Sequence, residues 1–328
     1  MIVLAVGAAW FLSSAVLSTW ANTTFLLTFE DPYFHTFIRF LGSSLIGLLS
    51  CVALSGTKVG ALPRLIGDVA FPAVLLCIAN CSNSVALASA GVTLTYVVKA
   101  CIPVFTVIIC RFVYDQRFST LIYISLIPIC AGGAVATGTD LDFKLGGFAA
   151  ALSSALSQTM MNISIKKVRA STGYSGPTAF LGMAIVSTFL TVPLLVFSAM
   201  FILPEQRSSV EIVRESLSQL SNGDRWPIIL MVVAALAYHI EYALNFAFVS
   251  YVSAVAFSVS DIARRIAIIV TGAFLFNKQL NPMNWLGISV ALSGVLWYSY
   301  LENQASKISG RNAEPKPKPK PRKQTKAE

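Results

Sequence analysis

The stretch LTYVVKACIPVF, from Leu94 to Phe105, is apolar at both ends and carries an ammonium group, that of Lys99, in its middle. It lies within an apolar run of roughly 20 residues, the length of helix that crosses about 30 Å of hydrocarbon. A charged side chain inside such a run is costly and usually serves a function. Lys99 therefore indicates a membrane protein in which something has to receive a buried positive charge.

Apolar runs of this length recur along the chain. Hydrophobic residues make up 55% of its 328 residues, against about 45–50% in soluble proteins. Backbone polar groups in lipid must pair within their own segment, so each run is predicted to be a helix, and the lack of strand-sized alternating segments disfavours a membrane barrel. We predict an all-α polytopic protein with ten spans. These are residues 2–21, 33–54, 67–89, 92–113, 119–138, 145–164, 177–203, 226–250, 252–276 and 283–302.

The C-terminal segment holds most of the net charge of +9. From residue 303 onward there are eight Lys/Arg and two acids, so six of the nine net charges lie there. Its sequence EPKPKPKPRKQTK alternates Pro with Lys, which excludes a helix and a packed core. We predict residues 303–328 to be a disordered cytosolic tail. Nucleic-acid binding is an alternative, but we favour an anchor beside anionic lipid and predict no nucleic-acid partner.

The six cysteines all fall inside predicted spans and form no CxxC pair. They are expected to act as small apolar residues and not as disulfides or metal ligands. We predict no cofactor. Residues 1–21 lack the basic start of a signal peptide and are expected to form the first span, while the presence of an upstream segment is left open.

Basic residues are unevenly shared between alternate connections. If the N-terminus faces the cytosol, most Lys and Arg of the connections are cytosolic, and the opposite side holds most of the acids. Because Lys and Arg accumulate on the cytosolic side of membranes, both termini are predicted to be cytosolic. The cytosolic residues are then Lys58, Arg64, Arg111, Arg117, Lys166, Lys167, Arg169 and the basic residues of the tail.

Two stretches resemble each other at a shift of 162 residues. FVYDQRFSTLIYISLIPICAGGAVA begins at Phe112 and FLFNKQLNPMNWLGISVALSGVLWY at Phe274, and Gly132 falls on Gly294. The shift maps the fourth and fifth spans onto the ninth and tenth. Because five is odd, the second copy is inverted across the membrane, as in many secondary transporters. The predicted five-helix repeats are residues 1–138 and 145–302.

Six charged residues lie inside the predicted spans. Three of them are in the ninth span. Inserting these three charges into the membrane costs on the order of 8–10 kcal/mol, whereas inserting the aliphatic and Phe residues of the same span is favourable by only about 4–7 kcal/mol. Partners or a water-filled cavity must receive these charges in the assembled protein. The four basic and two acidic residues are Arg39, Lys99, Arg264, Arg265, Glu241 and Asp261.

Polar residues also follow helical spacing in neighbouring spans. Tyr96 and Lys99 share one face of the fourth span, and Asn80 and Asn83 share one face of the third. These faces suggest one wet pocket between the helices. The alternative is that Tyr96 and the Asn residues only form hydrogen bonds between helices.

Several of the charges have a structural explanation as well. Asp261 can pair with the arginine four residues further on, and Glu241 can neutralise Arg264 or Lys99. Arg39 lies near a span end, from which its side chain can reach the headgroups. Lys99 and Arg264 are then the cations expected to lack protein partners.

The four cations exceed the two acids by two positive charges. A dianionic phosphate group suits this excess, because Arg presents a planar fork of donors and Lys a mobile point charge. The charge count therefore favours a phosphate-bearing solute as the missing partner.

Several segments resemble the triose-phosphate translocator family, within the drug/metabolite transporter superfamily. They are LTYVVKACIPVFTV, SDIARRIAIIV, NPMNWLGISVALSGVLWYSYLE and CSNSVALASAGVTLTYVVKA. The resemblance covers about residues 8–302. It implies ten helices in two inverted five-helix halves, and strict exchange of a phosphorylated organic solute, often against inorganic phosphate.

The resemblance also implies roles for particular residues. Lys99 falls on the family's phosphate-binding lysine, Arg264 on a second binding lysine and Arg265 on the neighbouring binding arginine. Asn83 falls where a pocket threonine is common, and Asn80 replaces a frequent histidine. The predicted substrate-binding residues are Lys99, Arg264, Arg265, Asn80, Asn83, Tyr96 and Glu241.

Glu241 falls where plastid members of the family carry a pocket tyrosine, and Ile102 replaces the usual acid before Pro103. An acid at position 241 would repel a phosphate unless it is paired. Whether Glu241 is a pocket residue or a structural counter-ion is left open by the sequence.

We interpret the chain as a secondary antiporter that exchanges a phosphorylated solute for inorganic phosphate or another phosphate ester, with the lipid bilayer as its other partner. A nucleotide-sugar or nucleoside monophosphate antiporter is the alternative. A membrane enzyme is disfavoured, because no HExxH, GxSxG or Cys/His cluster occurs. We expect an intracellular membrane, with the Golgi or endoplasmic reticulum favoured over the plastid envelope. The oligomeric state is left open.

Overall fold

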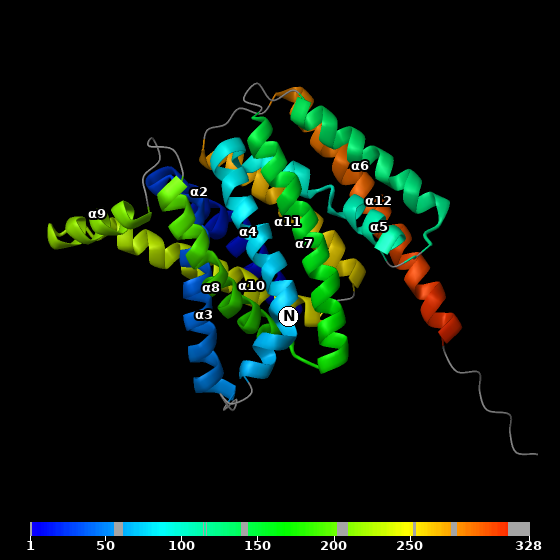
Figure 1. The fold of residues 1–328 in the computed structure, drawn as a ribbon. Coiled ribbons are helices and arrows are strands. Elements are labelled where there is room, and N and C mark those ends of the chain that lie inside the picture. The colour runs from blue at the N-terminus through cyan, green and yellow to red at the C-terminus, as the bar shows by residue number, and fades with distance from the viewer. Residues whose placement is uncertain are drawn as a thin grey trace, which may run out of the picture.

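The computed structural model describes residues 2–55, 62–113, 115, 117–138, 144–201, 209–251, 254–276 and 281–313. Nearly all of these residues are helical and none of them is in a strand (Figure 1), which confirms the all-α prediction. The helices are α1 (Ile2–Leu12), the π-helix η1 (Ser13–Ser18), α2 (Thr19–Phe29), α3 (Pro32–Ser55), α4 (Leu62–Lys99), α5 (Ile102–Val113), α6 (Thr120–Gly138), α7 (Leu145–Thr172), α8 (Gly176–Phe201), α9 (Ser209–Ser221), α10 (Trp226–Tyr251), α11 (Ala254–Leu275) and α12 (Pro282–Ala313).

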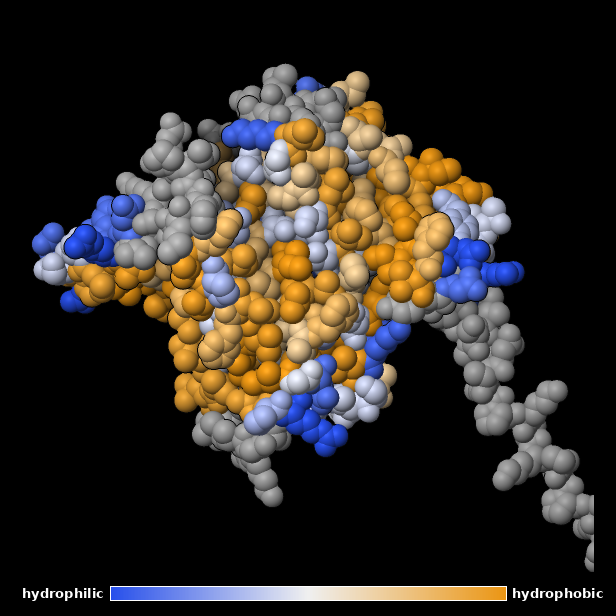
Figure 2. Space-filling model, viewed as in Figure 1, coloured by the Kyte–Doolittle hydropathy of each residue, from blue (hydrophilic) through white to orange (hydrophobic). Residues whose placement is uncertain are grey.

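The outer surface is that of a membrane protein. Among the described residues, four helical segments are long and apolar enough to cross a bilayer, namely Val3–Phe29, Leu62–Lys99, Gly176–Phe197 and Trp226–Asn245. Figure 2 shows hydrophobic side chains across the middle of one face, with hydrophilic ones gathered at its lower edge and on the outer part of α9. Large apolar side chains such as Leu49, Phe71 and Phe189 point outward. Such a surface fits contact with lipid.

Two predicted spans differ from the observed helices near Lys99. The predicted span 92–113 is not continuous, because α4 ends at Lys99 and α5 begins at Ile102, with a turn between them. The predicted break before residue 92 is a local one, at Gly91, whose φ of 76° and ψ of 178° interrupt α4. Glycine adopts this φ without steric cost. Lys99 therefore lies at a helix end and not in the middle of a helix.

The segments at the two ends of the chain are longer helices than predicted. The first span, predicted at 2–21, continues as helix to Phe29, and α12 continues to Ala313. The prediction of a disordered tail from residue 303 is therefore wrong for 303–313, which contain no proline and can extend the helix. Residues 314–328, with the Pro-Lys alternation, lie outside the described residues.

The helix α9 was not predicted from the span pattern. It lies between the seventh and eighth predicted spans and projects from the bundle (Figure 1). Its Ile212 and Ser216 are buried against the bundle, while Val213 and Leu217 are exposed. At 13 residues it is too short to cross a bilayer.

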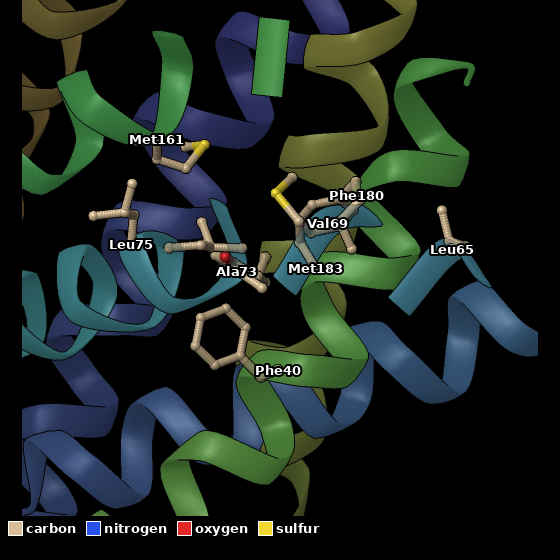
Figure 3. Packing of buried hydrophobic residues seen from close by; sticks show 10 residues of the cluster. Phe40, Leu65, Val69, Ala73, Leu75, Met161, Phe180 and Met183 are labelled. Carbon is tan, nitrogen blue, oxygen red and sulfur yellow. The ribbon is translucent and has the colours of Figure 1, made fainter. Parts of the chain in front are cut away.

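The interior is built around α4, which packs along α7 and α8 and also contacts α3 and α11. Figure 3 shows one of its apolar clusters, in which side chains from α3, α4, α7 and α8 meet. Phe40 of α3 lies against the side chains of α4 in this cluster, and Met161 and Met183 come from α7 and α8. Leu76, Met161 and Met183 belong both to this cluster and to the wall of the cavity described below.

A second close packing joins α6 and α12, which lie side by side in Figure 1. A Cβ on Gly132 would stand 2.5 Å from the carbonyl oxygen of Gly287 and even closer to the backbone nitrogen of Ala291. A Cβ on Gly294 would stand 2.9 Å from the backbone nitrogen of Ile129. The two glycines thus let the backbones of α6 and α12 touch.

Candidate functional site

A cavity of about 160 Å³ is lined by residues of α2, α3, α4, α7, α8, α10 and α11. The structure brings all seven predicted site residues into its wall, namely Lys99, Arg264, Arg265, Asn80, Asn83, Tyr96 and Glu241. Further polar residues, beyond those predicted from the sequence, also line it. They are Asn22, Arg39, Gln158, Asn162, Tyr238, Tyr242 and Asn245.

Asp261 holds the two arginines of α11 in place. Its Oδ1 accepts hydrogen bonds from Nε and Nη2 of Arg264, at 3.0 and 2.7 Å, and its Oδ2 accepts one from Nε of Arg265 at 3.0 Å. The three residues occupy positions i, i+3 and i+4, so one face of α11 presents them together. The expected pairing of Asp261 with Arg265 is confirmed, but Arg264 shares the same carboxylate.

Glu241 of α10 is the second acid of this cluster. Its Oε1 accepts a hydrogen bond from Nη1 of Arg264 at 3.0 Å and another from the hydroxyl of Ser14 at 2.7 Å. Nη1 of Arg264 also donates to Ser14 Oγ at 2.7 Å. Ser14 lies in the π-helical segment η1, so the irregular turn supplies a polar partner at the point where the acid and the arginine meet. Glu241 is thus both a residue of the cavity wall and a counter-ion.

These contacts correct one prediction. Arg264 was expected to lack a protein partner, but it forms ion pairs with both Asp261 and Glu241. The sequence left open whether Glu241 would pair with Arg264 or with Lys99, because only the packing of α10 against α11 decides which cation it meets.

Lys99 is placed at the cavity by the end of α4. In a continuous helix its carbonyl would accept a hydrogen bond from the residue four positions on, which is Pro103, and proline has no N–H to donate. The carbonyl instead accepts a hydrogen bond from Nη1 of Arg265 at 3.2 Å. The break in the helix therefore joins Lys99 to α11, and Pro103 is the sequence signal for it.

The side chain of Lys99 has a different environment from those of the arginines in α11. It is 8% exposed, and its Nζ lies 5.7 Å from the centre of the Tyr96 ring. This distance suits a cation–π contact. No carboxylate of the described residues forms an ion pair with Lys99.

Arg39 does not reach the headgroups, contrary to the prediction. It is 3% exposed, donates from Nη2 to Oδ1 of Asn80 at 3.1 Å, and places its guanidinium 4.7 Å from the centre of the Tyr238 ring. An amide oxygen and an aromatic face can stabilise an arginine inside the bundle, which explains why the side chain turns inward. Among the described residues, no carboxylate pairs with it.

The amide groups of the wall retain unused hydrogen-bonding capacity. Asn83 Oδ1 and Asn245 Oδ1 are buried and form no hydrogen bond with the described residues. A buried acceptor without a donor costs about 1–3 kcal/mol.

The site therefore belongs to a multi-pass membrane protein whose cavity is lined by cations, ion-paired acids and amides. Such a cavity fits a carrier of anionic solutes. The family model described as the Triose-phosphate Transporter family matches residues 1–299, and the chain belongs to this family. This is a family of transporters and not of enzymes, as the sequence predicted.

Curated relatives agree with this assignment. The chain is 26% identical to glucose-6-phosphate/phosphate translocator 2, chloroplastic, of Arabidopsis thaliana, over 89% of this chain and 73% of the relative. It is also 26% identical to phosphoenolpyruvate/phosphate translocator 1, chloroplastic, of Oryza sativa subsp. japonica, over 91% of this chain and 71% of the relative. Both relatives are chloroplast proteins by name, so the comparisons do not support the predicted preference for the Golgi or endoplasmic reticulum.

A solved crystal structure, described only as that of a protein, shares the fold. It has a TM-score of 0.52 and 13% sequence identity, and the match covers 92% of this chain and 98% of that one. At this identity the likeness concerns the fold alone.

Proposed function

We propose that the protein is a secondary antiporter that exchanges a phosphorylated organic solute for inorganic phosphate or another phosphate ester. The observation that carries this proposal is the cavity, in which Lys99 and Arg265 meet at the broken end of α4. The names of the relatives, which are phosphate-coupled translocators, support the same class of solute.

The proposed phosphate contacts are the ammonium group of Lys99 and the guanidinium groups of α11. Lys99 offers three donors and no carboxylate among the described residues competes for them. Arg265 uses Nε for Asp261 and Nη1 for the carbonyl of Lys99, and among the described residues no partner takes Nη2, which is the donor proposed for a ligand. The ion pairs of Arg264 fix the geometry of this group and prevent Glu241 from repelling an anion.

The remaining wall is proposed to bind the organic part of the solute. Tyr96, Asn80 and Asn83 line the cavity with Lys99 on the two parts of α4, before and after Gly91. Amide and phenol groups recognise hydroxyls by hydrogen bonds. This arrangement favours a small polyhydroxylated phosphate ester.

We also propose that the chain folds as two inverted five-helix repeats, residues 1–138 and 145–302, around this cavity. The glycine contacts of α6 and α12 support the repeat. A shift of 162 residues turns the contact made by the glycine of α6 into the contact made by the glycine of α12. It maps Gly132 onto Gly294 and Ile129 onto Ala291, so Gly132 against Ala291 and Gly294 against Ile129 form one reciprocal pair of contacts. A reciprocal pair is what an approximate two-fold axis between the repeats produces.

The proposed mechanism is alternating access in which the anion controls the movement. The empty cavity keeps an excess of positive charge that resists closure and transfer across the bilayer. A bound phosphate cancels this excess, so that the two repeats can rock around the occupied site. Exchange is then obligatory, because the empty carrier returns only slowly.

This mechanism makes a direct prediction about net uptake. Proteoliposomes loaded with inorganic phosphate should take up radiolabelled phosphate at least tenfold faster than liposomes without internal phosphate. A panel of sugar phosphates, nucleoside monophosphates and nucleotide sugars as competitors identifies the preferred solute. Rapid uptake into empty liposomes would contradict obligatory exchange, and competition by nucleoside monophosphates alone would select the nucleotide-sugar alternative.

Both termini are proposed to face the cytosol. An epitope tag placed after residue 328 should react with antibody in cells whose plasma membrane alone is permeabilised, and so should a tag before residue 1. Tags inserted at residues 140–143, on the proposed opposite side, serve as the matched control. Reaction only after the organelle membrane is opened would reverse the proposed orientation. The same imaging experiment identifies the organelle.

A further inference from the structure

The charges of the cavity wall divide into a neutral group and two remaining cations. Arg264, Arg265, Asp261 and Glu241 are joined by ion pairs, and their two positive and two negative charges cancel. The cations that line the same cavity without a carboxylate partner among the described residues are Lys99 and Arg39. The second unmatched charge thus lies on α3, at Arg39, and not on α11, where it is expected from the sequence.

We infer that Arg39 is a substrate-binding residue, whose positive charge matches the second negative charge of a phosphate dianion. The inference rests on the proposed function and names the charge of the solute that the site selects. Lys99 supplies the first charge from the end of α4, and Arg39 supplies the second from α3.

The environment of Arg39 supports a ligand-binding role. Of the donors of its guanidinium, Nη2 is used by Asn80 Oδ1 at 3.1 Å and lies 3.5 Å from Ser84 Oγ, Nε is enclosed, and Nη1 forms no hydrogen bond with the described residues. The stacked ring of Tyr238 and the amide of Asn80 hold the group in the wall but carry no formal charge. A buried guanidinium held by neutral groups retains its full charge for an anion.

A second observation shows that the position of Arg39 is fixed. Its helix contacts α4 through a network in which Ser84 Oγ lies 3.0 Å from Nδ1 of His35 and 2.8 Å from Oγ1 of Thr36. Nε2 of His35 lies 3.0 Å from Oδ1 of Asn22, which itself lines the cavity. Side chains one helical turn from Arg39 are therefore tied down, which suits a group that must meet a small anion at a set place.

The test compares two esters of the same sugar that differ by one negative charge. Glucose 6-phosphate is a dianion above its second pKa of about 6, whereas glucose 6-sulfate carries a single negative charge at every pH above neutrality. Both are offered at pH 7.5 to proteoliposomes loaded with inorganic phosphate. The measured quantity is the ratio of transport efficiencies, kcat/KM for the phosphate ester over that for the sulfate ester.

The wild-type protein should favour the phosphate ester at least tenfold. In Arg39→Gln the ratio should fall at least tenfold, because one charge has been removed from the site and the monoanion now matches it. Arg39→Lys, which keeps the charge, should retain most of the preference. Arg111→Gln is the matched surface control, since Arg111 is 39% exposed and pairs with Asp115, and it should leave the ratio unchanged.

Asn80→Asp gives a second, independent way to remove the charge. It places a carboxylate on the atom that already accepts from Arg39 at 3.1 Å, so Arg39 is neutralised and its side chain stays in place. The preference should fall as in Arg39→Gln, which keeps the test valid if that variant fails to fold.

Two results would overturn the inference. The first is an unchanged ratio in the variants, which includes an equal loss of transport of both esters, and the second is a wild-type protein that transports both esters equally well. Absence of any phosphate-coupled exchange by the wild-type protein would remove the proposed function itself, and this outcome is recognised before any variant is compared.

Discussion

Lys99→Gln is expected to abolish phosphate exchange while the protein stays folded. Removal of one partner from a buried charge pair costs about 2–5 kcal/mol of binding, which corresponds to a roughly 30-fold to several thousand-fold loss of affinity. The substitution weakens the binding of the anion and breaks no ion pair within the protein, because no carboxylate among the described residues pairs with Lys99. The bond from Arg265 uses the backbone carbonyl of Lys99, so the substitution leaves it intact.

Exchange of radiolabelled phosphate by purified Lys99→Gln in proteoliposomes measures this effect. Thermal unfolding in detergent, followed beside it, should give a midpoint at or above that of the wild-type protein, since a costly buried charge has been removed. Arg111→Gln serves again as the surface control. Exchange within threefold of wild type would exclude Lys99 from the binding site.

Gly132→Ala is expected to disrupt the packing of α6 on α12. The added Cβ would stand 2.5 Å from the carbonyl oxygen of Gly287 and against the backbone of Ala291, and a backbone cannot move aside as a side chain can. Overpacking of this kind costs about 1–3 kcal/mol and occasionally more. We expect a thermal midpoint several degrees lower and a smaller yield of monodisperse protein.

The neighbouring glycine provides the matched control for this substitution. Among the described residues, a Cβ on Gly133 would meet Sγ of Cys101, at 3.5 Å, which is an ordinary contact. Gly133→Ala should therefore be tolerated, and Gly294→Ala should resemble Gly132→Ala. If Gly132→Ala and Gly133→Ala were equally stable, the backbones of α6 and α12 would not be in close contact. The inverted repeat would then lose its main support.

Much of the helical pattern could be predicted because, in a membrane, local composition decides whether a segment becomes a helix. The predicted spans 33–54, 119–138 and 226–250 differ from α3, α6 and α10 by one residue at most at each end. The break after Lys99 was missed, although Pro103 marks it. A search for prolines four residues after an intramembrane charge would have found it.

The sequence singled out one pair of charges within a helix, and for Glu241 it left two possible partners on other helices. Asp261 and Arg265 are four residues apart, so helical geometry alone brings them together. The contact of Arg264 with Glu241 and the inward turn of Arg39 depend on how separate helices pack. Residue spacing carries no information on that packing, which is why the two unmatched cations were identified as Lys99 and Arg264 and not as Lys99 and Arg39.

Equilibrium binding of radiolabelled inorganic phosphate to the purified protein tests the central claim most directly. If the unmatched cations of the cavity form the anion site, binding should saturate near one phosphate per chain, phosphate esters should compete for it, and Lys99→Gln should bind at least 30-fold more weakly. No saturable binding by the wild-type protein, or equal binding by Lys99→Gln, would contradict the account.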